Sequence, residues 1–176
     1  RFSPAPVAEI APHLRSTDAA IRWAATYALT RTPKPEAAAL LLEVVDLPAA
    51  AGAGSAARSA ASDVRAHIAR GLARSGVPDS LQALARVALG RLLADAHPHV
   101  RINAVRSLAT YTTASRGLIQ ATIANDPDAN VRLAAIQAAS PVIGPDSALW
   151  ESLFAADTST MSRIAIVQAA NQQGFL

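Results

Sequence analysis

The chain has 176 residues and a formal net charge of +3, with 51% hydrophobic residues, 16% charged residues and no cysteine. This apolar content excludes a disordered chain, and the lack of cysteine excludes disulfide frameworks, thiolate nucleophiles and cysteine-ligated metal sites. No apolar run approaches the roughly 20 residues that a bilayer-spanning helix needs. Alanine, the strongest helix former, supplies 43 residues and Phe, Trp and Tyr together supply seven, so the composition predicts an all-α protein.

A repeated segment that begins at an arginine runs through the chain. Five arginines start it, at spacings of 43, 36, 31 and 31 residues: Arg22, Arg65, Arg101, Arg132 and Arg163. Apolar side chains recur three, four and seven positions after the arginine, as Ala104, Val105 and Leu108 do after Arg101. That spacing places them in one stripe along an amphipathic helix, with the arginine at its head.

Five helix pairs account for nearly the whole sequence, each joining a companion helix to an arginine-headed helix. In chain order we expect them at 4–31, 35–75, 79–110, 114–140 and 146–171. Residues 48–61, inside the second pair, are rich in Ala, Gly and Ser and are expected to form a flexible insertion. The predicted helix N-caps are Asp79, Asp128 and Asp146, and the predicted helix-ending glycines are Gly76 and Gly144.

Acidic residues in the turns are placed to compensate the arginines. A cation in the first turn, on the core-facing stripe, opposes the helix dipole and loses solvation. Asp95, Asp126 and Asp157 each lie six residues before an arginine, in the turn that precedes its helix. We therefore predict a ladder of Asp–Arg contacts that joins turns within or between repeats. Its expected role is to set the register of the stack, because partly exposed ion pairs contribute only about 0–1 kcal/mol.

The motif Val-Arg-x-x-Ala, preceded by a turn aspartate, resembles the HEAT repeat; it occurs at 100–104 and 131–135. The 31-residue spacing is similar to the short bacterial version called the phycobilisome-lyase-type HEAT-like repeat. The resemblance extends from Thr17 to about Asn171 and implies a right-handed α-solenoid of about five antiparallel helix pairs, with the second helix of each pair on the concave side. It implies the fold more specifically than the function, because such arrays serve as scaffolds, adaptors, chromophore lyases and parts of larger enzymes.

Residues two, five and nine positions after each arginine point away from the apolar stripe and form what we call the ridge. The candidate partner-binding residues of the ridge are Tyr27, Arg31, His67, Arg70, Arg74, Asn103, Arg106, Gln137 and Gln168, and alanines such as Ala134 and Ala165 occupy some of the same positions. Residues 51–116 carry a net charge of +6, against 0 for residues 1–50 and −3 for residues 117–176. The positive centre predicts a protein partner with an acidic surface.

Other distinctive residues are expected to be structural. Trp23, beside the first arginine, and Trp150 are both expected in the core. His97 and His99 lie near Asp95 but lack a third metal ligand, so we expect solvated turn residues. The sequence has neither a P-loop nor a nucleophile elbow, and we therefore expect no enzyme activity, no cofactor and no metal.

The sequence thus predicts a non-catalytic scaffold or accessory subunit that binds another protein and stabilises or assembles a larger complex. The repeat type suggests a membrane-bound photosynthetic, light-harvesting assembly, with any membrane association made through the partner. Three alternatives stay open: the HEAT segment of a larger exported bacterial enzyme such as a peptidyl-prolyl isomerase, a bilin lyase subunit, and a nucleic-acid-binding HEAT-like protein, which the low net charge disfavours. A start at Arg1 favours a processed piece of a longer protein, and together with the lack of cysteine it favours export to the periplasm, although the sequence does not fix the compartment.

Overall fold

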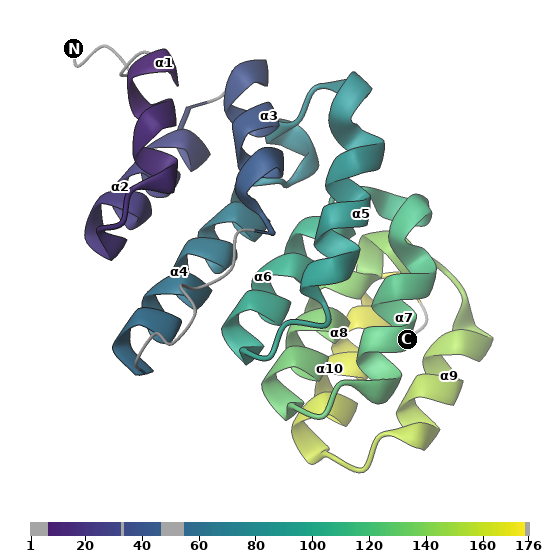
Figure 1. The fold of residues 1–176 in the computed structure, drawn as a ribbon. Helices are drawn as coiled ribbons and strands as arrows, with labels where there is room; N and C mark the ends of the chain where they lie inside the picture. Colours follow the sequence, from purple (N-terminus) through teal and green to yellow (C-terminus); the bar gives the residue numbers. More distant parts are fainter. Residues whose placement is uncertain (1–6, 33, 47–54, 175–176) are drawn as a thin grey trace.

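The computed structural model describes residues 7–32, 34–46 and 55–174, and this part of the chain is built from helices, turns and short connections without a β-strand. The α-helices are α1 (Val7–Ile10), α2 (Ala19–Thr30), α3 (Pro35–Val44), α4 (Ser55–Gly71), α5 (Gln82–Leu92), α6 (Pro98–Ala109), α7 (Arg116–Asn125), α8 (Ala129–Ile143), α9 (Ser147–Ala156) and α10 (Thr160–Asn171). Four 3-10 helices accompany them: η1 (Ala11–Arg15), η2 (Arg74–Gly76), η3 (Asp79–Leu81) and η4 (Thr112–Ser115). Figure 1 shows the helices following one another along an elongated stack.

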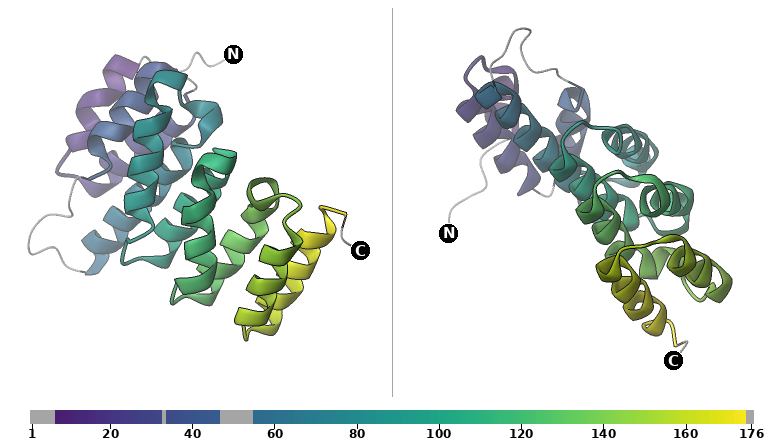
Figure 2. Two further views of the ribbon diagram at one scale, coloured as in Figure 1. Left: turned by 90° about the vertical axis from the view of Figure 1, so that its right-hand side faces the viewer. Right: turned by 90° about the horizontal axis from the view of Figure 1, so that it is seen from below.

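The helices form two layers. The even-numbered helices, which we call the second helices, pack directly on one another from α2 through α4, α6 and α8 to α10, whereas the odd-numbered first helices contact each other much less. The right-hand view of Figure 2 shows the two rows running side by side. This neighbour-to-neighbour packing confirms the predicted α-solenoid. The second helices form the tighter layer, as expected for the concave side of a curved stack.

The core lies between the layers and follows the predicted stripes. In α6, Ala104, Val105 and Leu108 are completely buried, and the equivalent stripe residues of α2, α4 and α8 are buried as well. The stripe is incompletely buried only in α10. There Val167 is exposed, because no further helix of the described chain packs against it. No helix in the described ranges is both long and apolar enough to cross a membrane.

Helix ends agree with the sequence in part. Asp128 and Asp146 cap α8 and α9 by accepting hydrogen bonds from backbone N–H groups, and Gly144 ends α8 with a φ of +64° that favours glycine. The prediction for Asp79 was wrong: it begins η3, and its Oδ1 accepts a hydrogen bond from the side chain of Gln82 instead of a backbone N–H. Gly76 ends the short helix η2, without a positive φ.

The last residues of the predicted insertion at 48–61 are helical. Residues 47–54 lie outside the described residues, but residues 55–61 are helical and form the first turns of α4. Four of those seven residues are alanine. The high helix propensity of alanine therefore outweighs the absence of a capping pattern, and α4 extends toward the N-terminus beyond its apolar stripe.

Candidate functional site

The arginines that head the repeats are paired in a staggered ladder. The Arg101 Nε and its second terminal nitrogen donate to the two carboxylate oxygens of Asp126 at 2.8 and 2.9 Å, and Arg65 Nε donates to Asp95 at 2.5 Å. Arg132 lies 3.7 Å from the Asp157 carboxylate. These three arginines therefore pair with the aspartate in the turn of the following repeat, so the ladder joins neighbouring repeats.

Asp95 and Asp126 offer their backbone carbonyls, not their carboxylates, to the arginines six residues later. Arg101 donates to the carbonyl oxygen of Asp95 at 2.9 Å, and Arg132 donates to that of Asp126 at 2.9 Å. Arg22 makes the same kind of contact with the carbonyl of Ser16 at 2.5 Å. One guanidinium thus holds its own turn by the backbone and the next turn by a side chain.

Protonation equilibria of the ladder follow from these contacts. Burial alone would raise the pKa of Asp95, but the hydrogen bonds from Arg65 and from the His97 backbone N–H lower it below its usual value. The hydrogen bond to Asp126 raises the pKa of Arg101 despite partial burial. Asp95 and Arg101 are therefore ionised at neutral pH.

The last arginine of the ladder packs on an aromatic ring instead of pairing with an aspartate. Arg163 is exposed, and its guanidinium carbon lies 4.0 Å from the ring centroid of Phe154, a cation–π contact with the first helix of its own pair. Within the described ranges no acidic residue of a following repeat is present to receive it.

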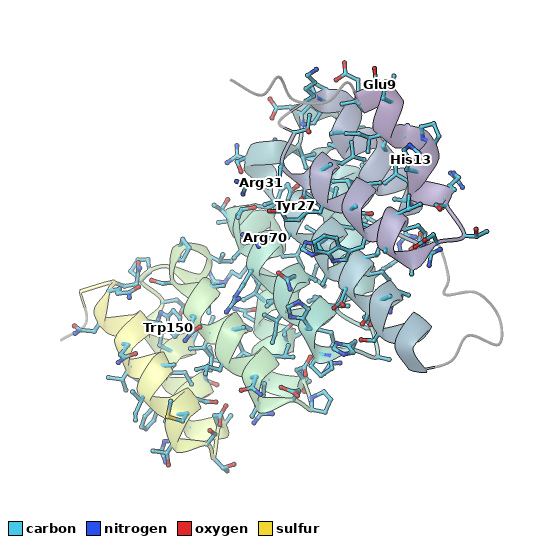
Figure 3. All side chains as sticks on the ribbon, turned by 90° about the vertical axis from the view of Figure 1, so that its left-hand side faces the viewer. Glu9, His13, Tyr27, Arg31, Arg70 and Trp150 are labelled. Atoms are coloured by element: carbon cyan, nitrogen blue, oxygen red, sulfur yellow. The ribbon has the colours of Figure 1, made fainter. Side chains whose placement is uncertain are left out.

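The ridge arginines contrast with the ladder arginines. Arg31, Arg70, Arg74 and Arg106 are exposed, and none of them forms an ion pair with an acid in the described part of the chain. Figure 3 shows Arg31 and Arg70 on the face of the second helices, on either side of Tyr27. The positive charge of this face is therefore available to a ligand.

The uncharged ridge residues differ from one another in exposure. Gln137 and Gln168 are exposed, and Asn103 is half-buried with its side-chain amide donating to the His99 carbonyl oxygen at 2.8 Å. Ala134 and Ala165 are buried, so the expectation that all positions two residues after the arginine face outward was wrong. Those positions lie at the contact between successive second helices, where a small side chain lets the helices approach.

An aromatic cluster joins the first two second helices. Trp23 and Tyr27 of α2 stack with ring centroids 5.3 Å apart and planes 4° apart, and the His67 ring of α4 stands edge-on to both at 5.3 and 5.6 Å. Trp23 is 39% exposed and Tyr27 is 43% exposed. The prediction of a core position for Trp23 was wrong, although it does pack on the neighbouring pair through His67. Trp150, in contrast, is buried as predicted.

His67 lies where the aromatic cluster meets the basic ridge. Partial burial lowers its pKa, the nearby charge of Arg70 lowers it further, and Asp63 acts in the opposite direction. The imidazole is therefore neutral at pH 7, and it can pack against the rings without adding a charge.

Tyr111 is an inter-repeat contact that the sequence analysis missed. Its ring is buried after the end of α6, and its hydroxyl donates to the Leu72 carbonyl oxygen at the end of α4 at 2.7 Å. Burial raises its pKa to about 12. The one available signal was an aromatic residue just past the end of a repeat, where a polar turn residue is usual.

A cavity of about 300 Å³ between α9 and α10 is lined largely by apolar side chains, among them Trp150, Phe154 and Ile166. No group of three or more His, Asp or Glu side chains in the described ranges is arranged to hold a metal ion. His97 and His99 are both exposed, as expected.

Residues 50–140, just over half of the chain, match a family model described as HEAT repeats. A search of curated proteins gives no match.

Proposed function

The chain belongs to the HEAT-repeat family, and from that premise we propose that it is a non-catalytic scaffold whose second-helix face binds an acidic surface of a partner protein. HEAT repeats are typical of protein-interaction scaffolds. The proposal fits a stack that presents one continuous face of second helices to its surroundings.

One observation carries the proposal: the arginines divide into two classes. Three of those that head the repeats, Arg65, Arg101 and Arg132, have acidic partners within the fold, whereas those of the ridge have none in the described part of the chain. Unpaired cations gathered on one face attract an acidic surface and speed its association. Arginine also suits this role because its planar guanidinium binds carboxylates in a bidentate manner.

The finer assignments remain proposals. An accessory subunit that assembles a larger complex, the photosynthetic setting, the short bacterial repeat subtype and export all rest on the sequence alone. The same holds for the alternatives of a parent enzyme, a bilin lyase and a nucleic-acid-binding protein. The family match supports protein binding, because HEAT repeats are typical of protein-interaction scaffolds.

The test compares charge reversals on and off the ridge. Arg70→Glu and Arg106→Glu change exposed ridge residues of α4 and α6, and Arg15→Glu changes an exposed arginine of η1 in the layer of first helices as a control. The partner is captured from native extract with the unmodified chain, purified and titrated against each variant. We expect each ridge variant to weaken binding at least about tenfold and the control to leave it unchanged. Equal binding by all three variants would refute the proposed face.

A further inference from the structure

We propose that the exposed rings of Trp23 and Tyr27 are the anchor point of this face, and that they receive a proline of an extended acidic segment whose carboxylates reach Arg31 and Arg70. This inference rests on the proposed function and specifies its ligand. The two rings are exposed, His67 holds them in place, and the cations Arg31 and Arg70 lie near them.

The exposure of the ring pair is unusual within this fold. Tyr111 and Trp150 are 5% and 2% exposed, whereas Trp23 and Tyr27 keep about two fifths of their surface open. They lie four residues apart on α2, so they share one face of the helix. Together the stacked rings form one apolar surface on α2, which belongs to the layer of second helices. Aromatic rings left open on a binding face are typical anchors of recognition.

The rings are also held in place before any ligand arrives. His67 extends from the next second helix and meets both rings edge-on, at interplanar angles of 82° and 84°. This contact fixes the aromatic pair against α4, and a binding surface that is already ordered loses less entropy on association.

The surrounding charges define what the anchor accepts. Arg31 is the C-cap of α2, four residues after Tyr27, and Arg70 follows His67 by one turn on α4. A lysine or arginine anchor would gain a cation–π contact with the rings but would be repelled by these two guanidinium groups. The anchor residue of the ligand is therefore uncharged, and its neighbours along the ligand are acidic.

Proline fits this description better than other apolar residues. Its flat ring stacks on an aromatic face, and proline keeps the peptide extended, which lowers the entropy lost on docking. An extended peptide also exposes the flanking carboxylates on both sides of the anchor. Arg31 and Arg70 lie on either side of Tyr27 in the view of Figure 3, as such a ligand requires.

Single-stranded nucleic acid is the competing ligand, because bases stack on aromatic rings and phosphates pair with arginine. The structure favours the peptide, since Trp23 and Tyr27 cover each other's inner faces and offer a single platform. The rest of the ridge continues with Asn103, Gln137 and Gln168, which provide no further ring for a second base.

The experiment uses two fluorescent peptides of about ten residues, both polyglutamate, one with two central prolines and the other with two central alanines. Each is titrated at low salt against the full chain and against Trp23→Ala, with Arg70→Glu to test the charge. Leu84→Ala is the matched control, because Leu84 is an apolar side chain of α5 that is 59% exposed. Circular dichroism verifies that each variant is folded.

We expect the proline peptide to bind the full chain about five to ten times more tightly than the alanine peptide. Trp23→Ala should remove that preference, Leu84→Ala should keep it, and Arg70→Glu should weaken both peptides. Acrylamide quenching gives a second readout: bound proline peptide should protect the exposed Trp23, whereas the buried Trp150 should not respond.

Equal affinities of the two peptides for the full chain, with loss of both in Arg70→Glu, would overturn the aromatic anchor and leave the acidic-partner function intact. Affinities that do not respond to Arg70→Glu, or no binding of either peptide, would overturn both. Tighter binding of an oligothymidine of the same charge would overturn the peptide ligand in favour of nucleic acid.

Discussion

The guanidinium of Arg101 holds both carboxylate oxygens of Asp126, a residue of the next repeat's turn, at 2.8 and 2.9 Å. The side chains of the two residues are only 9% and 6% exposed. The same guanidinium donates to the Asp95 carbonyl oxygen in the preceding turn. This buried pair therefore connects three successive segments of the stack.

Removal of Arg101 should be strongly destabilising. Arg101→Ala leaves the Asp126 carboxylate buried without its cation, and breaking a buried pair in this way costs about 3–5 kcal/mol. The free energy of unfolding is measured by urea denaturation followed by circular dichroism. Arg91→Ala is the control, because Arg91 and Asp46 form an exposed pair that should contribute less than about 1 kcal/mol. Similar losses in the two variants would contradict the structural role of the ladder.

The ladder should make stability depend on acid pH. The folded-state pKa of Asp95 is lowered, so the unfolded chain takes up its proton first as the pH falls. The stabilisation is present above the ordinary carboxyl value near pH 4 and is lost as the pH falls through the folded-state pKa. Asp95→Asn should be less stable than the unmodified chain at neutral pH, and its stability should fall less below pH 4. Parallel stability profiles for the two proteins would contradict this.

Tyr111 should make stability depend on alkaline pH. Its folded-state pKa is about 12 against an ordinary value of 10.0, so the stabilisation is complete below pH 10 and is lost as the pH rises toward 12. Tyr111→Phe should remove this loss and should cost about 1–3 kcal/mol at neutral pH, because the Leu72 carbonyl oxygen loses a buried donor. Absorbance titration at alkaline pH measures the missing tyrosine step, and thermal melts measure the stability. A titration identical to that of the unmodified chain would refute the assignment.

Two glycines should respond to alanine in opposite directions. A Cβ atom at Gly71 would lie 2.7 Å from Leu41 Cδ1 and 2.8 Å from Thr30 Cγ2, so Gly71→Ala should push α3 and α2 away from α4 and cost about 1–3 kcal/mol. At Gly117, in the first turn of α7, an added Cβ meets no atom within 4 Å. Gly117→Ala should therefore stabilise by up to about 1 kcal/mol through helix propensity. Denaturant midpoints of both variants test the pair, and a Gly71→Ala variant as stable as the unmodified chain would contradict the packing at Gly71, whereas a destabilised Gly117→Ala would contradict the open space at Gly117.

The sequence was sufficient to predict the helix pairs, because the period of the apolar residues and the positions of Asp128, Asp146 and Gly144 follow from local rules. Of the five predicted ladder arginines, Arg65, Arg101 and Arg132 pair with aspartates, whereas no ion pair of Arg22 or Arg163 is found in the described part of the chain. The sequence could not decide their partners, since Asp126 is equally available to Arg132 in its own repeat and to Arg101 in the previous one. That choice depends on how closely consecutive turns stack.

The outward face was harder to predict than the stripe. Trp23 is hydrophobic enough for a core, but its exposure depends on which side chain the adjacent helix brings to it, and that side chain is His67. Ala134 and Ala165 were assigned to solvent by helical angle alone. The contact surface between neighbouring second helices is wider than one apolar stripe. The sequence of a single helix does not show that width.

The stagger of the ladder gives each of the third and fourth hairpins a donor on one side and an acceptor on the other. Its turn aspartate takes the guanidinium of the hairpin before it, and its own arginine reaches on to the hairpin that follows. Hairpins connected in this way are interchangeable repeat units. A hairpin can be deleted or duplicated in a design without leaving an unpaired charge, provided that the chain is joined at equivalent positions of the repeat.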